Sequence, residues 1–202
     1  MAHIRSVCVY CGSSSGNGPI YLEAARSLGR TLAREKLKLV YGGGGIGLMG
    51  EIARAAIDAG GEVTGVIPDF LVAREHALTG AHGVIVTNDM HERKRTMFEL
   101  ADAFVALPGG IGTLEELVEQ MTWVQLGRHK KPLLILNLKK FWNPLLSLLE
   151  HQRKQGFIRT NSFEFLVAER VDDIVPMLRK AAQDVSEAEL REGGEIRVAE
   201  EM

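Results

Sequence analysis

The residues best suited to chemistry are three glycines followed by two glutamates, in the segment Pro108-Gly109-Gly110-Ile111-Gly112-Thr113-Leu114-Glu115-Glu116. Glycines let the backbone come close to a ligand, and the free N–H groups of a helix start attract an anion. A phosphate group is therefore the expected ligand of the glycines. Two carboxylates are unexpected beside a phosphate, and this combination is the main indication of function.

A purely structural interpretation of the same segment is a helix cap. Thr113 and Glu116 have the spacing of a capping box, in which the threonine hydroxyl and the glutamate satisfy backbone N–H groups at the helix start. Both acids would then only complement the helix dipole. This alternative leaves unexplained the three glycines in four positions that directly follow Pro108.

The segments on either side predict the elements that position these residues. Residues 103–107 are apolar and predict a buried strand. Residues 114–126 predict a helix with one apolar face, made of Leu114, Leu117, Val118, Met121 and Val124. The glycine-rich turn therefore joins the end of a strand to the start of a helix.

The rest of the chain repeats this pattern of strand, glycine-rich turn and helix. Further strands are predicted at 6–10, 37–41, 62–67, 83–87, 132–138 and 163–168. Further helices are predicted at 20–34, 51–59, 90–101, 141–154 and 171–182. Apolar strands that alternate with amphipathic helices predict an α/β fold with a parallel sheet of about seven strands, covered on both faces. Residues 1–183 are expected to form a single domain, followed by an acidic, disordered tail at 184–202.

Charge and composition narrow the class of partner. The chain has 202 residues and a net charge of −2. The tail holds seven acids and two arginines, a net −5, so residues 1–183 carry +3. This mild positive charge suits an anionic small molecule and is too weak to predict binding to nucleic acid. No apolar run approaches the ~20 residues that cross a membrane, so no membrane partner is expected.

The N-terminus and the cysteines indicate a cytoplasmic protein. The first strand begins at once, which leaves no room for a signal peptide. Cys8 and Cys11 form a C-x-x-C motif on a strand, where odd spacing sends the two side chains to opposite faces. We interpret them as reduced structural thiols rather than a redox or zinc pair. The six histidines are scattered and none pairs at i, i+4 with another ligand, so we expect no metal and no cofactor.

Four segments rich in glycine, hydroxyls or charge follow the predicted strands. They are Cys11–Gly16, Gly42–Gly50, Asp89–Arg95 and Pro108–Glu116. In a parallel sheet, ligands bind at the carboxyl ends of the strands. The four segments are therefore expected to surround one site.

A dinucleotide cofactor is the alternative ligand. Residues Gly45–Gly50 fit G-x-G-x-x-G between a strand and a helix, and Asp69 lies at a suitable distance to bind a ribose hydroxyl. However, the motif follows the second strand rather than the first. The Pro108 segment also competes for the phosphate.

The helix start at Asp89–Arg95 carries six charged or titratable residues. Cations at a helix start oppose the helix dipole, so stability alone does not explain Arg93, Lys94 and Arg95. A solvated basic surface is the structural alternative. Beside an anion site, we expect at least one of the three to be functional.

These motifs together resemble the LONELY GUY (LOG) family of cytokinin riboside 5′-monophosphate phosphoribohydrolases, once labelled lysine decarboxylases. The matching residues are Cys11-Gly12-Ser13-Ser14, the Gly42–Gly50 run, Met90-His91-Glu92-Arg93-Lys94, Pro108-Gly109-Gly110-x-Gly112-Thr113-x-x-Glu116, and Met121-Thr122-Trp123-x-Gln125-Leu126-Gly127. The resemblance covers most of residues 5–180. It implies a Rossmann-like doubly wound sheet, a homodimer, and hydrolysis of the N-glycosidic bond of nucleoside 5′-monophosphates, with AMP accepted by bacterial relatives.

The resemblance also implies roles for particular residues. It makes Arg93 and Glu116 catalytic. The expected substrate-binding residues are Ser13, Gly44, Gly45, Glu75, Lys94, Gly109, Gly110, Ile111, Gly112, Thr113, Leu114, Glu115 and Thr122. Breaking the base–ribose bond passes through an oxocarbenium-like state, by analogy with glycosidases, which a carboxylate near C1′ stabilises.

Three points stay open at this stage. Adjacent helical residues are ~100° apart, so only one of Glu115 and Glu116 can face C1′ squarely. The sequence does not indicate whether adenine or an N6-prenylated adenine is the preferred base. Trp123 lies off the main apolar face of its helix and contributes either to a dimer interface or to packing within its own subunit.

Overall fold

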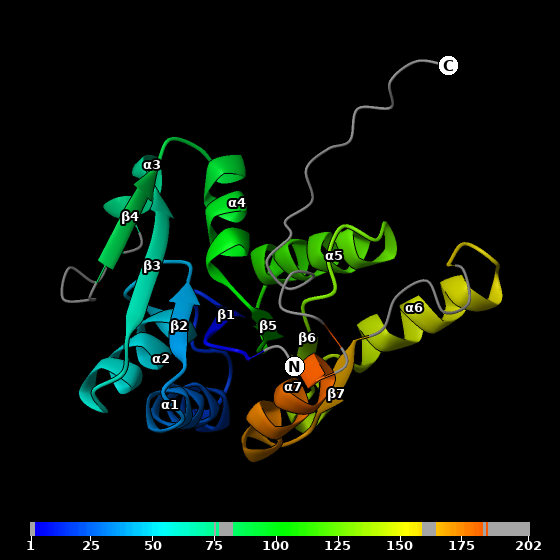
Figure 1. The fold of residues 1–202 in the computed structure, drawn as a ribbon, viewed down its shortest axis with the longest axis horizontal. Helices are drawn as coiled ribbons and strands as arrows, with labels where there is room; N and C mark the ends of the chain where they lie inside the picture. The colour runs from blue at the N-terminus through cyan, green and yellow to red at the C-terminus, as the bar shows by residue number, and fades with distance from the viewer. Residues whose placement is uncertain (1–2, 75, 77–82, 159–164, 184, 186–202) are drawn as a thin grey trace.

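The computed structural model describes residues 3–74, 76, 83–158, 165–183 and 185. Within them, seven strands form one parallel sheet in the order β4-β3-β2-β1-β5-β6-β7 (Figure 1). The strands are β1 (Ser6–Tyr10), β2 (Lys38–Tyr41), β3 (Val63–Pro68), β4 (Gly83–Thr87), β5 (Ala103–Ala106), β6 (Leu133–Leu136) and β7 (Leu166–Ala168). The predicted α/β fold and parallel sheet are confirmed.

The strand order reverses between β1 and β5. From β1 the chain builds outward through β2 and β3 to β4, then returns to pair β5 with the other side of β1. Val7 lies opposite Ala103, and Tyr10 opposite Ala106. In doubly wound sheets the loops diverge at such a reversal and leave a crevice above the strand ends. The crevice here lies between the segments that follow β1 and β5.

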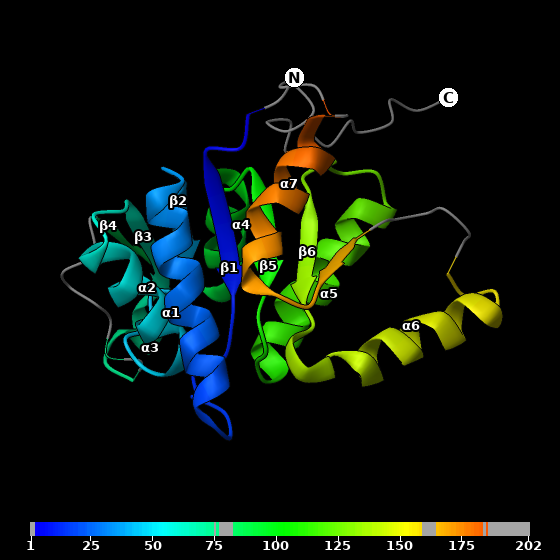
Figure 2. The ribbon, with the colours of Figure 1, turned by 90° about the horizontal axis from the view of Figure 1, so that it is seen from below.

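Helices cover both faces of the sheet. The α-helices are α1 (Pro19–Arg34), α2 (Gly47–Asp58), α3 (Asp69–Val72), α4 (Met90–Leu100), α5 (Ile111–Gln125), α6 (Asn143–Lys154) and α7 (Ile174–Gln183). Two 3₁₀ turns, η1 (Leu138–Lys140) and η2 (Val171–Asp173), precede α6 and α7. In Figure 2, α1 and α7 lie in front of the sheet, with α4 and α5 behind it.

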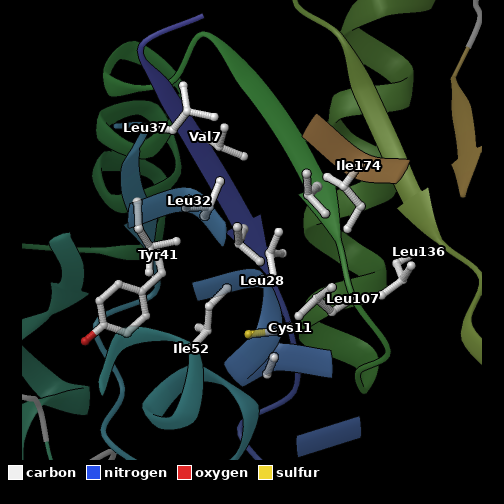
Figure 3. Packing of buried hydrophobic residues seen from close by; sticks show 14 of the residues in the cluster. Val7, Cys11, Leu28, Leu32, Leu37, Tyr41, Ile52, Leu107, Leu136 and Ile174 are labelled. Carbon is white, nitrogen blue, oxygen red and sulfur yellow. The ribbon is translucent and has the colours of Figure 1, made fainter. Parts of the chain in front are cut away.

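The two layers of helices enclose two apolar cores. One core joins the sheet to α1, α2 and α7, where Val7, Leu28, Ile52 and Leu107 interdigitate (Figure 3). The other joins the sheet to α4 and α5, and α6 contributes partly buried leucines at its rim. Because both faces of the strands are covered, β1, β5 and β6 are buried along their whole length, and Ser6 of β1 is their only hydroxyl residue besides Tyr10.

The cysteines behave as their spacing predicts. Cys8 belongs to the core beneath α4 and α5, whereas Cys11 belongs to the core beneath α1 and α2. Both are buried and neither forms a disulfide. In the described part of the chain, no helix is long and apolar enough to cross a membrane.

Several element boundaries differ from the prediction. Helix α2 begins at Gly47, because the N–H groups of Leu48 and Met49 bind the Gly12 carbonyl oxygen at 3.0 and 3.3 Å. Helix α5 begins at Ile111, three residues earlier than predicted. The last predicted helix is divided into η2 and α7, and the short α3 is an addition to the predicted elements. The acidic tail at 184–202 lies outside the described residues except for Val185.

Candidate active site

A cavity of about 350 Å³ occupies the crevice between the ends of β1 and β5. One wall is the loop of residues 12–17 that follows β1, and the opposite wall is Pro108–Gly110. Tyr21, Leu48 and Phe141 complete the lining. Three of the expected substrate-binding residues, Ser13, Gly109 and Gly110, therefore line one cavity.

The start of α5 directly follows Gly110, which lines this cavity, and it has unpaired backbone donors. The first hydrogen bond of the helix runs from the Leu114 N–H to the Gly110 carbonyl oxygen, at 3.0 Å. Among the described residues, the N–H groups of Ile111, Gly112 and Thr113 have no hydrogen-bond acceptor. A side chain at Gly110 or Gly112 would meet nothing within 4 Å. This open helix N-terminus is suited to bind a phosphate.

The capping-box interpretation of Thr113 and Glu116 is wrong. Gly110, which has no side chain, occupies the N-cap position, and Thr113 lies inside the first turn and is buried. The Glu116 carboxylate accepts a hydrogen bond from Arg93 instead of the helix start. The helix therefore leaves its first donors available to a ligand.

Gly109 is needed for the close approach of the two cavity walls. The Gly12 N–H donates to the Pro108 carbonyl oxygen at 3.2 Å. A Cβ at Gly109 would lie 2.2 Å from Thr113 Oγ1 and 2.9 Å from the Gly12 nitrogen. Only a residue without a side chain fits both contacts.

Arg93 and Glu116 form a buried ion pair between α4 and α5. Arg93 Nη1 lies 3.0 Å from Glu116 Oε1, and the two residues are 8% and 7% exposed. Arg93 Nε donates to the Val66 carbonyl oxygen of β3 at 3.1 Å. Asp89 positions the helix that carries Arg93, since its carboxylate accepts the N–H groups of His91 and Glu92.

Burial controls the ionisation of Glu116. Loss of solvent is the largest influence and raises its pKa, the positive charge of Arg93 opposes this, and the resulting pKa is about 7. A carboxylate with a pKa near neutrality can exchange protons at physiological pH. Glu116 follows the start of α5 by one and a half turns, about 8 Å of helix rise.

The loop after β2 leaves room for Arg93. A Cβ at Gly42 would lie 2.3 Å from Arg93 Nη2 and 3.0 Å from the Met49 sulfur. The sequence places Gly42 in a glycine run but gives no sign that it accommodates an arginine 51 positions later. The sequence also gives no sign that the Val66 carbonyl accepts a hydrogen bond from Arg93, because any residue type can supply a backbone acceptor.

Glu115 and Lys94 lie on a different surface from Glu116. Lys94 Nζ contacts Glu115 Oε1 at 2.6 Å and Glu119 Oε1 at 3.0 Å. Burial lowers the pKa of Lys94, but the hydrogen bonds to both glutamates outweigh it and raise that pKa. Glu119 was not among the expected site residues, although it lies one helical turn beyond Glu115.

The remaining expected residues are placed as follows. Gly44 is buried and Gly45 is partly buried in the loop that precedes α2. Leu114 is partly buried in the first turn of α5. Thr122 is exposed near the end of α5, about 16 Å of helix rise from its start, and donates to the Val118 carbonyl oxygen. Thr122 is thus not brought to the cavity. Glu75 lies outside the described residues.

Trp123 packs within its own chain. Its ring meets Phe98 of α4 edge-on, with centroids 4.9 Å apart, and the Arg128 guanidinium lies over it at 5.2 Å. These contacts favour the interpretation of Trp123 as a residue that packs α5 against α4.

The glycine motif at Gly45–Gly50 is not arranged to bind a dinucleotide. The Leu48 and Met49 N–H groups at the start of α2 are occupied by the Gly12 carbonyl. A Cβ at Gly47 would lie 2.3 Å from the backbone of Ser13. The glycine therefore packs two protein segments together where a pyrophosphate would have to bind. In the described residues, no group of three or more His, Cys, Asp or Glu side chains is placed to hold a metal ion.

The sheet order and the crevice define a Rossmann-like α/β domain. Two solved structures show the same fold. The molybdenum cofactor carrier protein of Chlamydomonas reinhardtii superposes with a TM-score of 0.69 at 20% identity, covering 90% of this chain and 99% of that one. The molybdenum cofactor binding protein of Rippkaea orientalis superposes with a TM-score of 0.65 at 21% identity, covering 89% of this chain and 98% of that one.

Sequence comparison identifies the family within this fold. Residues 49–179 match the family described as "Possible lysine decarboxylase". The cytokinin riboside 5′-monophosphate phosphoribohydrolase of Rhodococcoides fascians is 51% identical over 158 residues, 76% of this chain and 78% of that protein. The corresponding LOG1 enzyme of Arabidopsis thaliana is 43% identical, over 90% of this chain and 89% of its own. This chain belongs to the LOG family.

Proposed function

We propose that this protein hydrolyses the N-glycosidic bond of nucleoside 5′-monophosphates, releasing the free base and ribose 5-phosphate. The supporting observation is the buried Arg93–Glu116 pair, located one and a half turns from an open helix N-terminus. The names of the relatives from Rhodococcoides fascians and Arabidopsis thaliana specify cytokinin riboside 5′-monophosphates. AMP and its N6-prenylated analogues are therefore the proposed substrates.

The 5′-phosphate binds the N–H groups of Ile111, Gly112 and Thr113. The positive end of the α5 dipole adds to these donors, and the charge of the phosphate fixes the orientation of the substrate. This anchor directs the ribose along the helix toward Glu116. Glu116 then faces the sugar rather than the phosphate, which accounts for a carboxylate so close to the glycines, whereas Glu115 is directed outward to Lys94.

Glu116 acts on the reacting carbon. Its carboxylate stabilises the oxocarbenium-like C1′ or accepts a proton from the attacking water. The water oxygen bonds to C1′ as the bond to the base nitrogen breaks, and the proton of the water ends on the base. Arg93 stays charged, holds Glu116 in place, and stabilises negative charge on the departing base.

The direct test is incubation with AMP and with its N6-isopentenyl analogue, followed by chromatography of the free bases. We expect base release from at least one of them, and the ratio of the two kcat/KM values identifies the preferred base. A folded protein that releases neither base would contradict the proposal.

We also propose that two copies pair through the outward face of α5. Ile111, Val118 and Leu126 are 83%, 41% and 76% exposed and lie on one side of the helix. Glu115 and Thr122 lie on the same side, so pairing would bring these two expected substrate-binding residues to the interface. We expect a dimer in sedimentation velocity at micromolar concentration and a monomer for Val118→Glu. A monomeric parent protein would refute this.

The other expectations from the sequence stay predictions. The cytoplasmic location and the absence of a nucleic-acid partner depend on the features of the sequence given above. The roles of the individual site residues are tested by the variants described below.

A further inference from the structure

An arginine of α2 holds the glycine-rich loop that precedes its own helix. Arg54 Nη1 donates to the Gly45 carbonyl oxygen at 2.9 Å. Gly45 belongs to the run Gly42–Gly45 that joins β2 to Ile46 and the helix start. The interior of this run has no side chains through which other residues could fix it. The contact from Arg54 is therefore an external constraint on a segment with many accessible conformations.

Arg54 is itself held by Glu51, which Arg26 holds in turn. Its Nη2 donates to Glu51 Oε1 at 2.6 Å, and Arg26 Nε of α1 lies 2.5 Å from Glu51 Oε2. The hydrogen bond from Arg54 lowers the pKa of Glu51, so the carboxylate is ionised at neutral pH. One carboxylate thus bridges two arginines from adjacent helices. This bridge restricts the guanidinium of Arg54 to the direction of the loop.

The last glycine of the G-x-G-x-x-G motif makes this contact possible. A Cβ at Gly50 would lie 2.9 Å from Arg54 Nη1 and 2.2 Å from the Gly45 carbonyl oxygen. A larger residue would occupy the space between donor and acceptor. Gly50 of the motif is therefore explained by a contact between the loop and an arginine.

The other end of the loop contacts Arg93 of the proposed catalytic pair. Gly42 is packed so closely against Arg93 that a Cβ would lie 2.3 Å from Nη2. Gly43 has a φ of 79°, a conformation that favours glycine, and lies against Ile67. The loop is thus fixed at Gly45 by Arg54 and packed at Gly42 against Arg93. Arg93 has its own bonds to Val66 and Glu116, which do not depend on Arg54.

We propose that Arg54, held by Glu51 and Arg26, is a positioning residue that fixes the Gly42–Gly45 loop for binding the nucleoside 5′-monophosphate. This inference rests on the proposed function. Since Arg93 and Glu116 are held independently, loss of Arg54 should affect substrate binding more than the chemical step. A general loss of folded protein would instead reduce kcat and leave KM unchanged.

The test compares Arg54→Met, Arg54→Lys and Glu51→Gln with the parent full-length protein, using AMP as substrate. We expect Arg54→Met to raise KM about tenfold, as for loss of one hydrogen bond from a charged group, while kcat stays within about twofold. Arg54→Lys keeps one charged donor and should recover most of the loss. Glu51→Gln should give an intermediate KM. The matched control is Arg30→Met, which removes an exposed ion pair with Glu23 on α1 and should change neither constant.

A second measurement makes the result independent of activity. Amide hydrogen exchange of residues 43–46 in the ligand-free protein should be faster in Arg54→Met than in the parent or in Arg30→Met. Unchanged exchange and unchanged KM in Arg54→Met would each overturn the positioning role. If the parent releases no base from any monophosphate, the proposed function fails, and the exchange measurement alone decides whether Arg54 fixes the loop.

Discussion

Substitution of Glu116 by glutamine isolates the charge of the proposed catalytic carboxylate. Glutamine has the same shape, and its amide oxygen can still accept the hydrogen bond from Arg93 Nη1. The Glu116 side chain is 9% exposed, so solvent screens its charge only weakly. A pre-placed electrostatic group is worth about 3 kcal/mol in the transition state, which corresponds to a fall in kcat of roughly a hundredfold or more.

The assay measures initial rates of adenine release from AMP for the parent, Glu116→Gln and Glu115→Gln. Glu115 is the internal control, because its exposed carboxylate contacts Lys94 rather than Arg93. We expect Glu115→Gln to reduce kcat much less than Glu116→Gln does. We also expect Glu116→Gln to keep a KM and a melting temperature close to those of the parent. Parent-like turnover in Glu116→Gln together with an inactive Glu115→Gln would refute the assignment and move the catalytic role by one residue.

Three further results are expected. Burial raises the Glu116 pKa to about 7, and the ionised carboxylate is the active form, so kcat should increase as the pH rises through about 7. The pH–rate profile of Glu116→Gln should lack this increase. Arg93→Ala should abolish most turnover and also lower the melting temperature, since it leaves the buried Glu116 carboxylate unpaired. An unchanged kcat together with an unchanged melting temperature would contradict the role of the pair. Gly110→Ala should keep the parent's stability, because its Cβ meets nothing within 4 Å, but should raise KM for AMP by crowding the phosphate. Gly109→Ala should raise KM and also reduce stability. Calorimetry measures the effect on stability, and titration with AMP measures the effect on binding.

The strands and their parallel arrangement are predictable because each strand is an apolar run that ends at glycine, proline or a polar residue. The strand Gly83–Thr87 is predicted with the bounds that the structure has. Helix starts are less predictable, because they depend on distant partners. Helix α2 begins at Gly47 since the Gly12 carbonyl, 35 positions earlier, accepts its first N–H groups. A local pattern of residue types contains no information about that acceptor.

The candidate site is predictable in outline for the same reason. The loops that converge at the strand ends follow from the parallel sheet, and Pro108–Gly110 and residues 12–17 do line one cavity. Residue types alone leave Glu115 and Glu116 undistinguished, because both follow the glycines. The ~100° turn between them directs Glu116 inward to Arg93 and Glu115 outward to Lys94. Arg93 is singled out from its basic neighbours by burial, which depends on Gly42 and β3.

The most direct test of the central claim is the identity of the products formed from AMP. Chromatography of a reaction with the purified full-length protein should give adenine and ribose 5-phosphate in equal amounts, and Glu116→Gln should form both at a rate lower by roughly a hundredfold or more. Release of adenosine and inorganic phosphate would place the reaction at the phosphoester bond instead. That result, or the absence of any product from AMP and its N6-isopentenyl analogue, would contradict hydrolysis of the N-glycosidic bond by the Arg93–Glu116 pair.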